Sequence, residues 1–456
     1  MSLPPDGTTQ SPRPGDSPPG SDARRPMRSG VRWGRLLVLA SVAVLALGLA
    51  DLGLASRPPG ATPAALPSVA STAAPSTAAP SPASVESQVA DVEARVPALR
   101  DLEPTRAVPN RIVDEAQLRR DIARLFDQEN PPARLAAGQA LLQRMGLLPS
   151  GFDLRSQYVD ALGTGVAGYY DEQTREMTIV QRSAAFGPVE RLTLAHEFTH
   201  ALQDMHFGLS SLEGTDTTQG DRALARTALV EGDASLAMAR YAQRYLTPAD
   251  LFAVAVAAGD PAQTRMLDAL PPLLRRQLEF PYVDGLQFVS ALYARGGWAA
   301  VDAAYAKPPG STAQILHPDL YLAGVEPVSV SLPDVPGALG AGWRESAADT
   351  AGEMATGVWL SAVAGSATAT TVAAGWAGDR VGSYDGPDGT WAEAWVTAWT
   401  SQAAATSFAA AAEPSGPSAP ASPLRRVVRG TDPSRVTVVF ASDAATLAGL
   451  AGAVGR

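Results

Sequence analysis

The chain has 456 residues, of which 46% are hydrophobic, and this is enough for two domains with appended segments. The formal net charge of -10 argues against a nucleic-acid-binding protein, because phosphate contacts need a basic surface. The sequence contains no cysteine, which excludes a disulfide scaffold, a cysteine-ligated zinc site and a cysteine nucleophile.

The N-terminal part begins with two segments of contrasting composition. Residues 1–35 are rich in Pro, Gly, Ser and Asp, and they are predicted to be a disordered cytoplasmic tail because they contain too little apolar surface to fold. Residues 36–55 form an apolar run whose one charged residue is Asp51. We interpret this run as an uncleaved membrane anchor, or alternatively as a signal peptide that is cut after Ala50 or Ala55.

The charges around the apolar run predict the orientation of the chain. Five arginines lie between Arg24 and Arg35, directly before the run. Positive charge is retained on the cytoplasmic side, so the rest of the chain is expected outside the cytoplasm, at the cell membrane. Residues 56–85 repeat Ala, Pro, Ser and Thr and are predicted to be an extended stalk.

Ordered structure is predicted from about residue 85, and the first ordered unit is expected to span residues 91–336. Apolar residues spaced three and four apart predict helices over 87–99, 114–126, 132–145, 188–207 and 221–245. Two short strands, 166–170 and 176–181, are predicted to form a hairpin. Further helices over 247–305 are expected to be interrupted at prolines, among them Pro281, and residues 308–336 are expected to be irregular.

The composition changes near Pro336, and residues 345–456 are predicted to be a smaller α+β domain. The predicted elements are helices over 352–364, 401–413 and 443–454, strands over 390–400 and 435–441, and a Pro/Ser-rich loop over 414–423. Trp391, Trp395 and Trp399 fall on one face of the first of these strands. We interpret this row as core packing rather than as a surface on which a ligand stacks.

The motif that indicates chemistry is His196-Glu197-x-x-His200, inside the predicted helix 188–207. Residues four apart lie on one face of a helix, about 40° apart around its axis, so two imidazoles can reach one metal ion. Neutral imidazole suits zinc, and a zinc ion lowers the pKa of bound water, whose proton Glu197 can accept. Because only four histidines occur in the chain, this spacing is a specific signal.

A third protein ligand is needed, and three residues are candidates. Glu231 lies on the next predicted helix between apolar neighbours, where an unpaired carboxylate would be costly. Gly232 beside it would let two helix backbones approach closely. His206 follows His200 by six residues, but no glycine breaks the helix between them, so His206 should point away from the metal. Asp204 falls about 80° from His196 around the helix axis. Glu231 is therefore favoured.

These motifs resemble the gluzincin zinc metallopeptidases, in their peptidase MA-like branch. The resemblance covers roughly residues 160–325 and is carried by "AHEFTH", "LVEGDA" and "FPYVDGLQFVSALYARGGW". The last stretch matches an aromatic–Gly–Phe-Val–Leu–Gly pattern at Tyr282, Gly285, Phe288, Val289, Leu292 and Gly296. The resemblance implies a zincin-like catalytic domain, and it does not cover the C-terminal unit. The fold class that we expect for the chain is therefore mainly helical α+β, with the zincin-like domain followed by the smaller α+β domain.

The resemblance also implies residue roles. His196, His200 and Glu231 would bind Zn2+, Glu197 would be the general base, and the hairpin would offer an edge strand to an extended peptide. Thermolysin-type gluzincins have an aspartate four residues after the ligand glutamate, where this chain has Ser235. The carboxylate that supports a histidine ligand therefore stays open between Asp233, Asp221 and Asp204. The candidates for stabilising the oxyanion are Tyr282, Tyr241 and Arg222.

The function predicted from the sequence is an extracytoplasmic zinc-dependent peptidase that hydrolyses peptide bonds through a metal-activated water. Its expected partners are a peptide or protein substrate and the membrane, and not nucleic acid. Two alternatives remain: a zinc hydrolase of a non-peptide amide in the cell envelope, and a degenerate zincin that keeps its metal as a staple and serves as a structural or binding protein.

Overall fold

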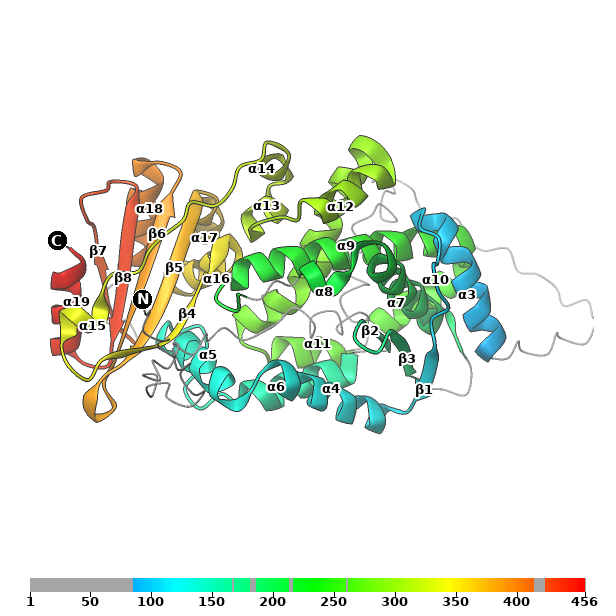
Figure 1. Cartoon of the computed structure of the whole chain (residues 1–456), viewed down its shortest axis with the longest axis horizontal. Helices are drawn as coiled ribbons and strands as arrows, with labels where there is room; N and C mark the ends of the chain where they lie inside the picture. Colours follow the sequence, from blue (N-terminus) through cyan, green and yellow to red (C-terminus); the bar gives the residue numbers. More distant parts are fainter. Residues whose placement is uncertain are drawn as a thin grey trace, which may run out of the picture.

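The computed structural model describes residues 85–165, 168–180, 186–212, 216–259, 261–413 and 423–455. It confirms the predicted fold class: a helical region is followed by a region built on a five-stranded antiparallel sheet (Figure 1). The predicted tail and membrane anchor, nearly all of the stalk and most of the 414–423 loop lie outside the described residues. In the described part of the chain, none of the helices combines the length and the apolar character needed to cross a membrane.

The first helices of the described chain follow the predicted periodicity. They are α3 (Val85–Arg100), α4 (Glu115–Glu129) and α5 (Pro132–Arg144). The Asp114 side chain caps α4 by accepting a hydrogen bond from the backbone N–H of Gln117 at 2.7 Å. A further helix, α6 (Leu154–Gly165), was not predicted, although it buries Leu154, Tyr158 and Leu162 at helical spacing.

A small sheet lies beside these helices and contains the predicted hairpin. Strands β2 (Gly168–Asp171) and β3 (Glu176–Val180) pair antiparallel, which confirms the hairpin. An unpredicted strand, β1 (Asn110–Val113), pairs parallel with β3 and gives the strand order β1-β3-β2. Only the last of its four residues is buried, so its sequence carries no alternating apolar signal.

The centre of the helical region is formed by α7 (Pro188–Phe207), α9 (Gly220–Tyr245) and α12 (Pro272–Ala306). The close approach predicted at Gly232 is confirmed and is reciprocal. A Cβ atom on Gly232 would lie 2.2 Å from the carbonyl oxygen of Gly285 on α12, and one on Gly285 would lie 2.2 Å from that of Ala228. Glycine at both positions therefore sets how closely α9 and α12 pack.

Two predictions for this region were wrong. Pro281 does not interrupt α12, which stays helical through this residue; its backbone kinks instead at Gly296 and Gly297, whose dihedral angles are not helical. Proline removes one helical hydrogen bond and costs about 3 kcal/mol, and the packing of α12 along α9 outweighs this loss. The stretch 308–336 was predicted to be irregular, but it contains the short helices α13 (Thr312–Leu316) and α14 (Pro318–Leu322). Both are too short to show a helical repeat of apolar residues in the sequence.

The remaining helices of this region are short. They are α8 (Leu209–Leu212), α10 (Pro248–Ala258) and α11 (Pro261–Asp268). Helix α15 (Val335–Leu339) follows them in the chain and packs with the C-terminal sheet. Pro248 and Pro261 occupy the first positions of α10 and α11, as the predicted interruptions require.

The C-terminal sheet has the strand order β4-β5-β6-β8-β7, and all neighbouring strands are antiparallel. Its strands are β4 (Arg344–Asp349), β5 (Trp376–Asp385), β6 (Trp391–Trp399), β7 (Leu424–Val428) and β8 (Arg435–Ala441). Its helices are α16 (Gly352–Ala364), α17 (Ser366–Ala373), α18 (Gln402–Ala412) and α19 (Ala444–Val454). Helix α16 covers the face toward the helical region, and α15 and α19 lie on the far side of the sheet (Figure 1).

The tryptophan row packs in the core, as predicted. The ring of Trp395 lies 5.1 Å from that of Trp359, and the ring of Trp399 stacks on Phe408 at 4.4 Å. Trp391, at the start of β6, is half-buried next to the Arg144 guanidinium. Strands β4, β5 and β7 were not predicted, because glycine and charged residues interrupt their apolar pattern.

Candidate metal centre

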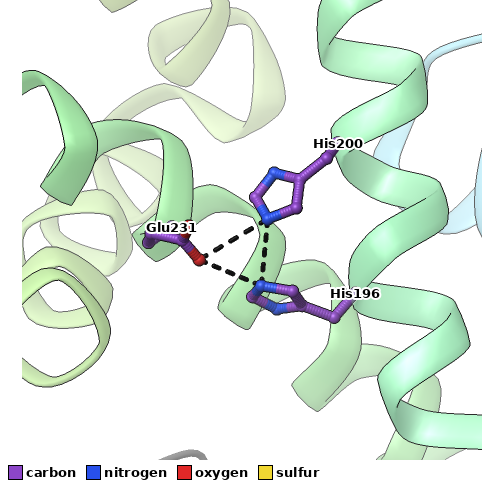
Figure 2. Close-up of side chains that lie close together, drawn as sticks. All are labelled: His196, His200 and Glu231. Atoms are coloured by element: carbon purple, nitrogen blue, oxygen red, sulfur yellow. Dashed lines mark hydrogen bonds and ion pairs between the residues drawn. The ribbon is translucent and has the colours of Figure 1, made fainter. Parts of the chain in front are cut away.

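Two neighbouring helices bring three metal-ligand side chains together. His196 and His200 lie one turn apart on α7, and Glu231 lies on α9. The Nε2 atom of His196 is 3.0 Å from Oε2 of Glu231 and 3.1 Å from Nε2 of His200, and the Nε2 atom of His200 is 3.5 Å from the same Oε2. All three side chains are fully buried and point toward one another (Figure 2).

These distances fit a zinc ion. With zinc–ligand bonds of about 2.0–2.1 Å and tetrahedral angles, two ligand atoms are separated by about 3.3 Å. The observed separations of 3.0, 3.1 and 3.5 Å scatter around that value. In addition, the other carboxylate oxygen of Glu231 is buried and has no hydrogen-bond partner in the described part of the chain. Two imidazoles and one carboxylate also form a ligand set that zinc prefers.

The electrostatics of the cluster differ between its histidines. Burial lowers the pKa of His196. Burial also acts to lower the pKa of His200, but the negative charge of Glu231 outweighs it and raises this pKa to about 9. For Glu231, burial is opposed by the charge of His200 and by hydrogen bonds from both histidines, so its pKa is lowered. The cluster therefore holds negative charge on Glu231, as a cation site requires.

Glu197 lies on α7 next to the first histidine and is also buried. Its Oε2 atom accepts a hydrogen bond from the backbone N–H of Tyr170 in β2 at 3.0 Å. The ring of Tyr170 is fixed in turn, because its hydroxyl lies 3.0 Å from a carboxylate oxygen of Asp204. Strand β2 is thus held against α7 at the position of Glu197.

A buried polar network adjoins His200, and most of its members could not be identified from the sequence. Oε1 of Gln203 lies 2.8 Å from Nδ1 of His200, and Nε2 of Gln203 lies 2.9 Å from Asp233. Asp233 also accepts hydrogen bonds from Arg100 of α3 and from Tyr305 of α12. Of the three aspartates considered as support for a histidine, Asp233 is thus the one joined to the cluster, through Gln203.

The other two aspartates and the alternative ligand His206 have different partners. The Nε2 atom of His206, near the end of α7, lies 2.7 Å from the backbone oxygen of Glu103, and its side chain is exposed. Asp204 pairs with Arg106 at 2.8 Å. Asp221 contacts Thr312 and lies ten residues before Glu231, about 15 Å along α9. The structure does not bring these residues into the cluster.

The three candidates for stabilising an oxyanion lie at different distances from the cluster. The ring of Tyr282 lies 6.1 Å from the ring of His196 and is buried. Tyr241 is ten residues from Glu231, about 15 Å along the helix, and packs against Tyr245. Arg222 lines a different cavity, next to β5 of the C-terminal sheet. Tyr282 is therefore the one that lies beside the cluster.

Comparison with known proteins bears on the C-terminal region. Residues 339–451 match a family described as a domain of unknown function (DUF8575). This match covers the five-stranded sheet and does not include the buried cluster. Comparisons with curated proteins and with solved structures gave no match. The chemistry of the site therefore has to be argued from its geometry.

Proposed function

We propose that the protein is a zinc-dependent peptidase of the gluzincin type. The observation that carries this proposal is the tetrahedral spacing of the donor atoms of His196, His200 and Glu231, with Glu197 on the adjacent helical position. A structural zinc site has four protein ligands, whereas a catalytic site has three and keeps one position open. Three donors meet here among the residues that the structure describes, which favours catalysis.

In this proposal each side chain has one task. A bound zinc ion would supply a Lewis acid that polarises a carbonyl group and lowers the pKa of water. Glu197 accepts a proton from the attacking water and passes it to the amine that leaves. The backbone N–H group of Tyr170 donates a hydrogen bond to the Glu197 carboxylate and so fixes its orientation beside the metal donors. Tyr282, whose ring lies 6.1 Å from that of His196, is the proposed residue for stabilising the oxyanion, through its hydroxyl group.

A peptide is the proposed substrate because of the strand beside Glu197. Strand β2 is an outer strand of its sheet and passes directly along α7. An extended peptide can add to such a strand through backbone hydrogen bonds, which places its peptide bond next to the base. A non-peptide amide has no backbone to pair in this way, so this feature favours a peptide or protein substrate.

One observation favours a second candidate, a metal that only staples the fold. All three donor side chains and Glu197 are buried, as they would be in a closed structural site. A structural site, however, has no use for a buried glutamate beside the ligands, and burying that charge is costly. A staple predicts that metal removal unfolds the protein, whereas catalysis predicts that metal removal mainly stops turnover.

The first test is metal content. The purified protein, after dialysis, is expected to contain one zinc ion per chain, because the donors form one site. Elemental analysis measures the ratio, and a His196→Ala/His200→Ala variant, which lacks two donors, serves as the control and is expected to be metal-free. A metal-free wild-type protein that cleaves peptides at full rate would rule out the proposal.

We further propose that residues 56–456 lie outside the cytoplasm and are held at the membrane by residues 36–55. The support is the apolar run with arginines before it. Protease treatment of intact cells is therefore expected to release a fragment that lacks roughly the first 50 residues, the part that is cytoplasmic or in the bilayer. Immunodetection of a C-terminal tag reads the result, and protection of the tag in intact but not in lysed cells would contradict this orientation.

A further inference from the structure

We propose that Gln203 is a positioning residue that fixes the tautomer of His200, and that Asp233 and Arg100 fix Gln203 in turn. The inference rests on the proposed metal site and extends it to residues of α3 that are more than 90 positions away in the sequence. It concerns what fixes the orientation of the His200 ring, which neither the motif nor the three donors explain.

The amide of Gln203 can adopt only one orientation. Its Nε2 atom lies 3.0 Å from the backbone oxygen of Val230 and 2.9 Å from a carboxylate oxygen of Asp233. Both of these atoms only accept hydrogen bonds, so the amide must present its NH2 group to them. The amide oxygen then faces Nδ1 of His200 at 2.8 Å.

This orientation determines where His200 carries its proton. An amide oxygen only accepts, so Nδ1 of His200 must be the protonated nitrogen. In the neutral ring, Nε2 is then left with its lone pair, directed at Glu231 and at Nε2 of His196. A metal ligand needs that lone pair, and a hydrogen bond on the other ring nitrogen makes it a better donor.

Asp233 is held in place by more than Gln203. Its two carboxylate oxygens accept from Nε and Nη2 of Arg100 at 2.6 and 3.0 Å, and the hydroxyl of Tyr305 donates to it at 2.7 Å. Arg100 is itself fully buried, pairs with Asp302 at 2.6 Å and lies over the ring of Trp298 at 4.3 Å. A buried bidentate pair of this kind has little freedom to rotate.

The other histidine provides an internal contrast. The Nδ1 atom of His196 is buried and has no hydrogen-bond partner in the part of the chain that is described. The network therefore contacts only one of the two histidine ligands, His200. An effect on His200 that leaves His196 unchanged separates a positioning role from general loosening of α7.

The test combines NMR of the histidine rings with zinc titration. Because the chain has only four histidines, the ring signals of zinc-loaded, 15N-histidine-labelled protein can be assigned by single substitutions. In the wild type, His200 is expected to show a slowly exchanging Nδ1–H proton. In Gln203→Leu this proton should exchange rapidly, and the zinc affinity, measured by competition with a chelator, should fall roughly 10- to 100-fold.

Two further variants make the result specific. Gln203→Glu keeps an oxygen toward His200, but it places its second oxygen against the acceptor atoms of Val230 and Asp233. The zinc affinity of this variant should therefore also fall. The control is Thr199→Val, a near-isosteric change on α7 that removes a buried hydrogen bond to the backbone oxygen of Ala195 and leaves the network intact. Thr199→Val should retain both the slowly exchanging Nδ1–H proton of His200 and the zinc affinity of the wild type.

The outcomes are distinct. A folded Gln203→Leu variant with the protected Nδ1–H proton and wild-type zinc affinity would overturn the inference while leaving the metal site in place. A wild-type protein that binds no zinc would overturn both. Zinc binding and the expected changes in a protein that cleaves no peptide would support the inference and contradict only the proposed activity.

Discussion

Replacement of Glu197 by glutamine is expected to remove nearly all peptide hydrolysis while the metal and the fold are retained. An amide cannot accept the proton of the attacking water, and general bases typically contribute about 10²–10⁴-fold to the rate. The amide oxygen of a glutamine can still accept the hydrogen bond from the N–H of Tyr170, so β2 should stay against α7. None of the three metal donors is changed.

The measurement is the rate of cleavage of a peptide library, followed by mass spectrometry, together with zinc content and thermal unfolding of each protein. The matched control is Glu190→Gln, the same substitution on the same helix. Glu190 accepts a hydrogen bond from the backbone N–H of Gly187 at 2.9 Å, which glutamine can also do, so this variant should cleave at the wild-type rate. A Glu197→Gln protein as fast as the wild type would show that Glu197 is not the base, and would favour a metal with a structural role.

The local part of the site could be predicted from the sequence, because its geometry follows from helical spacing. Residues four apart on α7 must share a face, so His196 and His200 were certain to lie together once the helix was recognised. Glu231 lies 31 residues further on, but its apolar neighbours made an unpaired carboxylate implausible there. The cost of burying an unpaired carboxylate thus indicated that Glu231 lies with the two histidines, which helical spacing alone could not show.

The supporting network could not be predicted, because its members come from helices far apart in the sequence. Arg100 and Asp233 are separated by 133 positions, and neither belongs to a local pattern. Gln203 carries no signal of its own in the sequence, because its contact with His200 depends on the acceptors that surround its amide group.

The errors in the fold have related causes. The four-residue strand β1 and the polar strand β5 are held by pairing with neighbouring strands, which the periodicity of one segment does not reveal. Pro281 was predicted to interrupt a helix on local grounds, yet α12 packs along α9 through the glycine contact at Gly285. Tertiary packing outweighed local propensity in each case.

The choice between Glu231 and His206 as the third ligand leads to the second large effect. Glu231→Ala is expected to lower zinc affinity by far more than the roughly 10- to 100-fold loss that is typical of an outer partner, because it removes a donor atom from the site. His206→Ala is expected to change affinity little, because its imidazole contacts the backbone of Glu103 and not the cluster.

The two variants are best compared by zinc titration against a chelator at one pH, because protons compete with the metal for the ligands. Glu231→Gln is a useful companion, since it keeps the shape of the side chain while removing its charge, and it should lie between the wild type and Glu231→Ala in affinity. Circular dichroism of each protein shows whether α7 and α9 remain folded. If His206→Ala lost zinc while Glu231→Ala retained it, the third ligand would be His206, six residues after His200, and the proposal of a gluzincin-type site would be wrong.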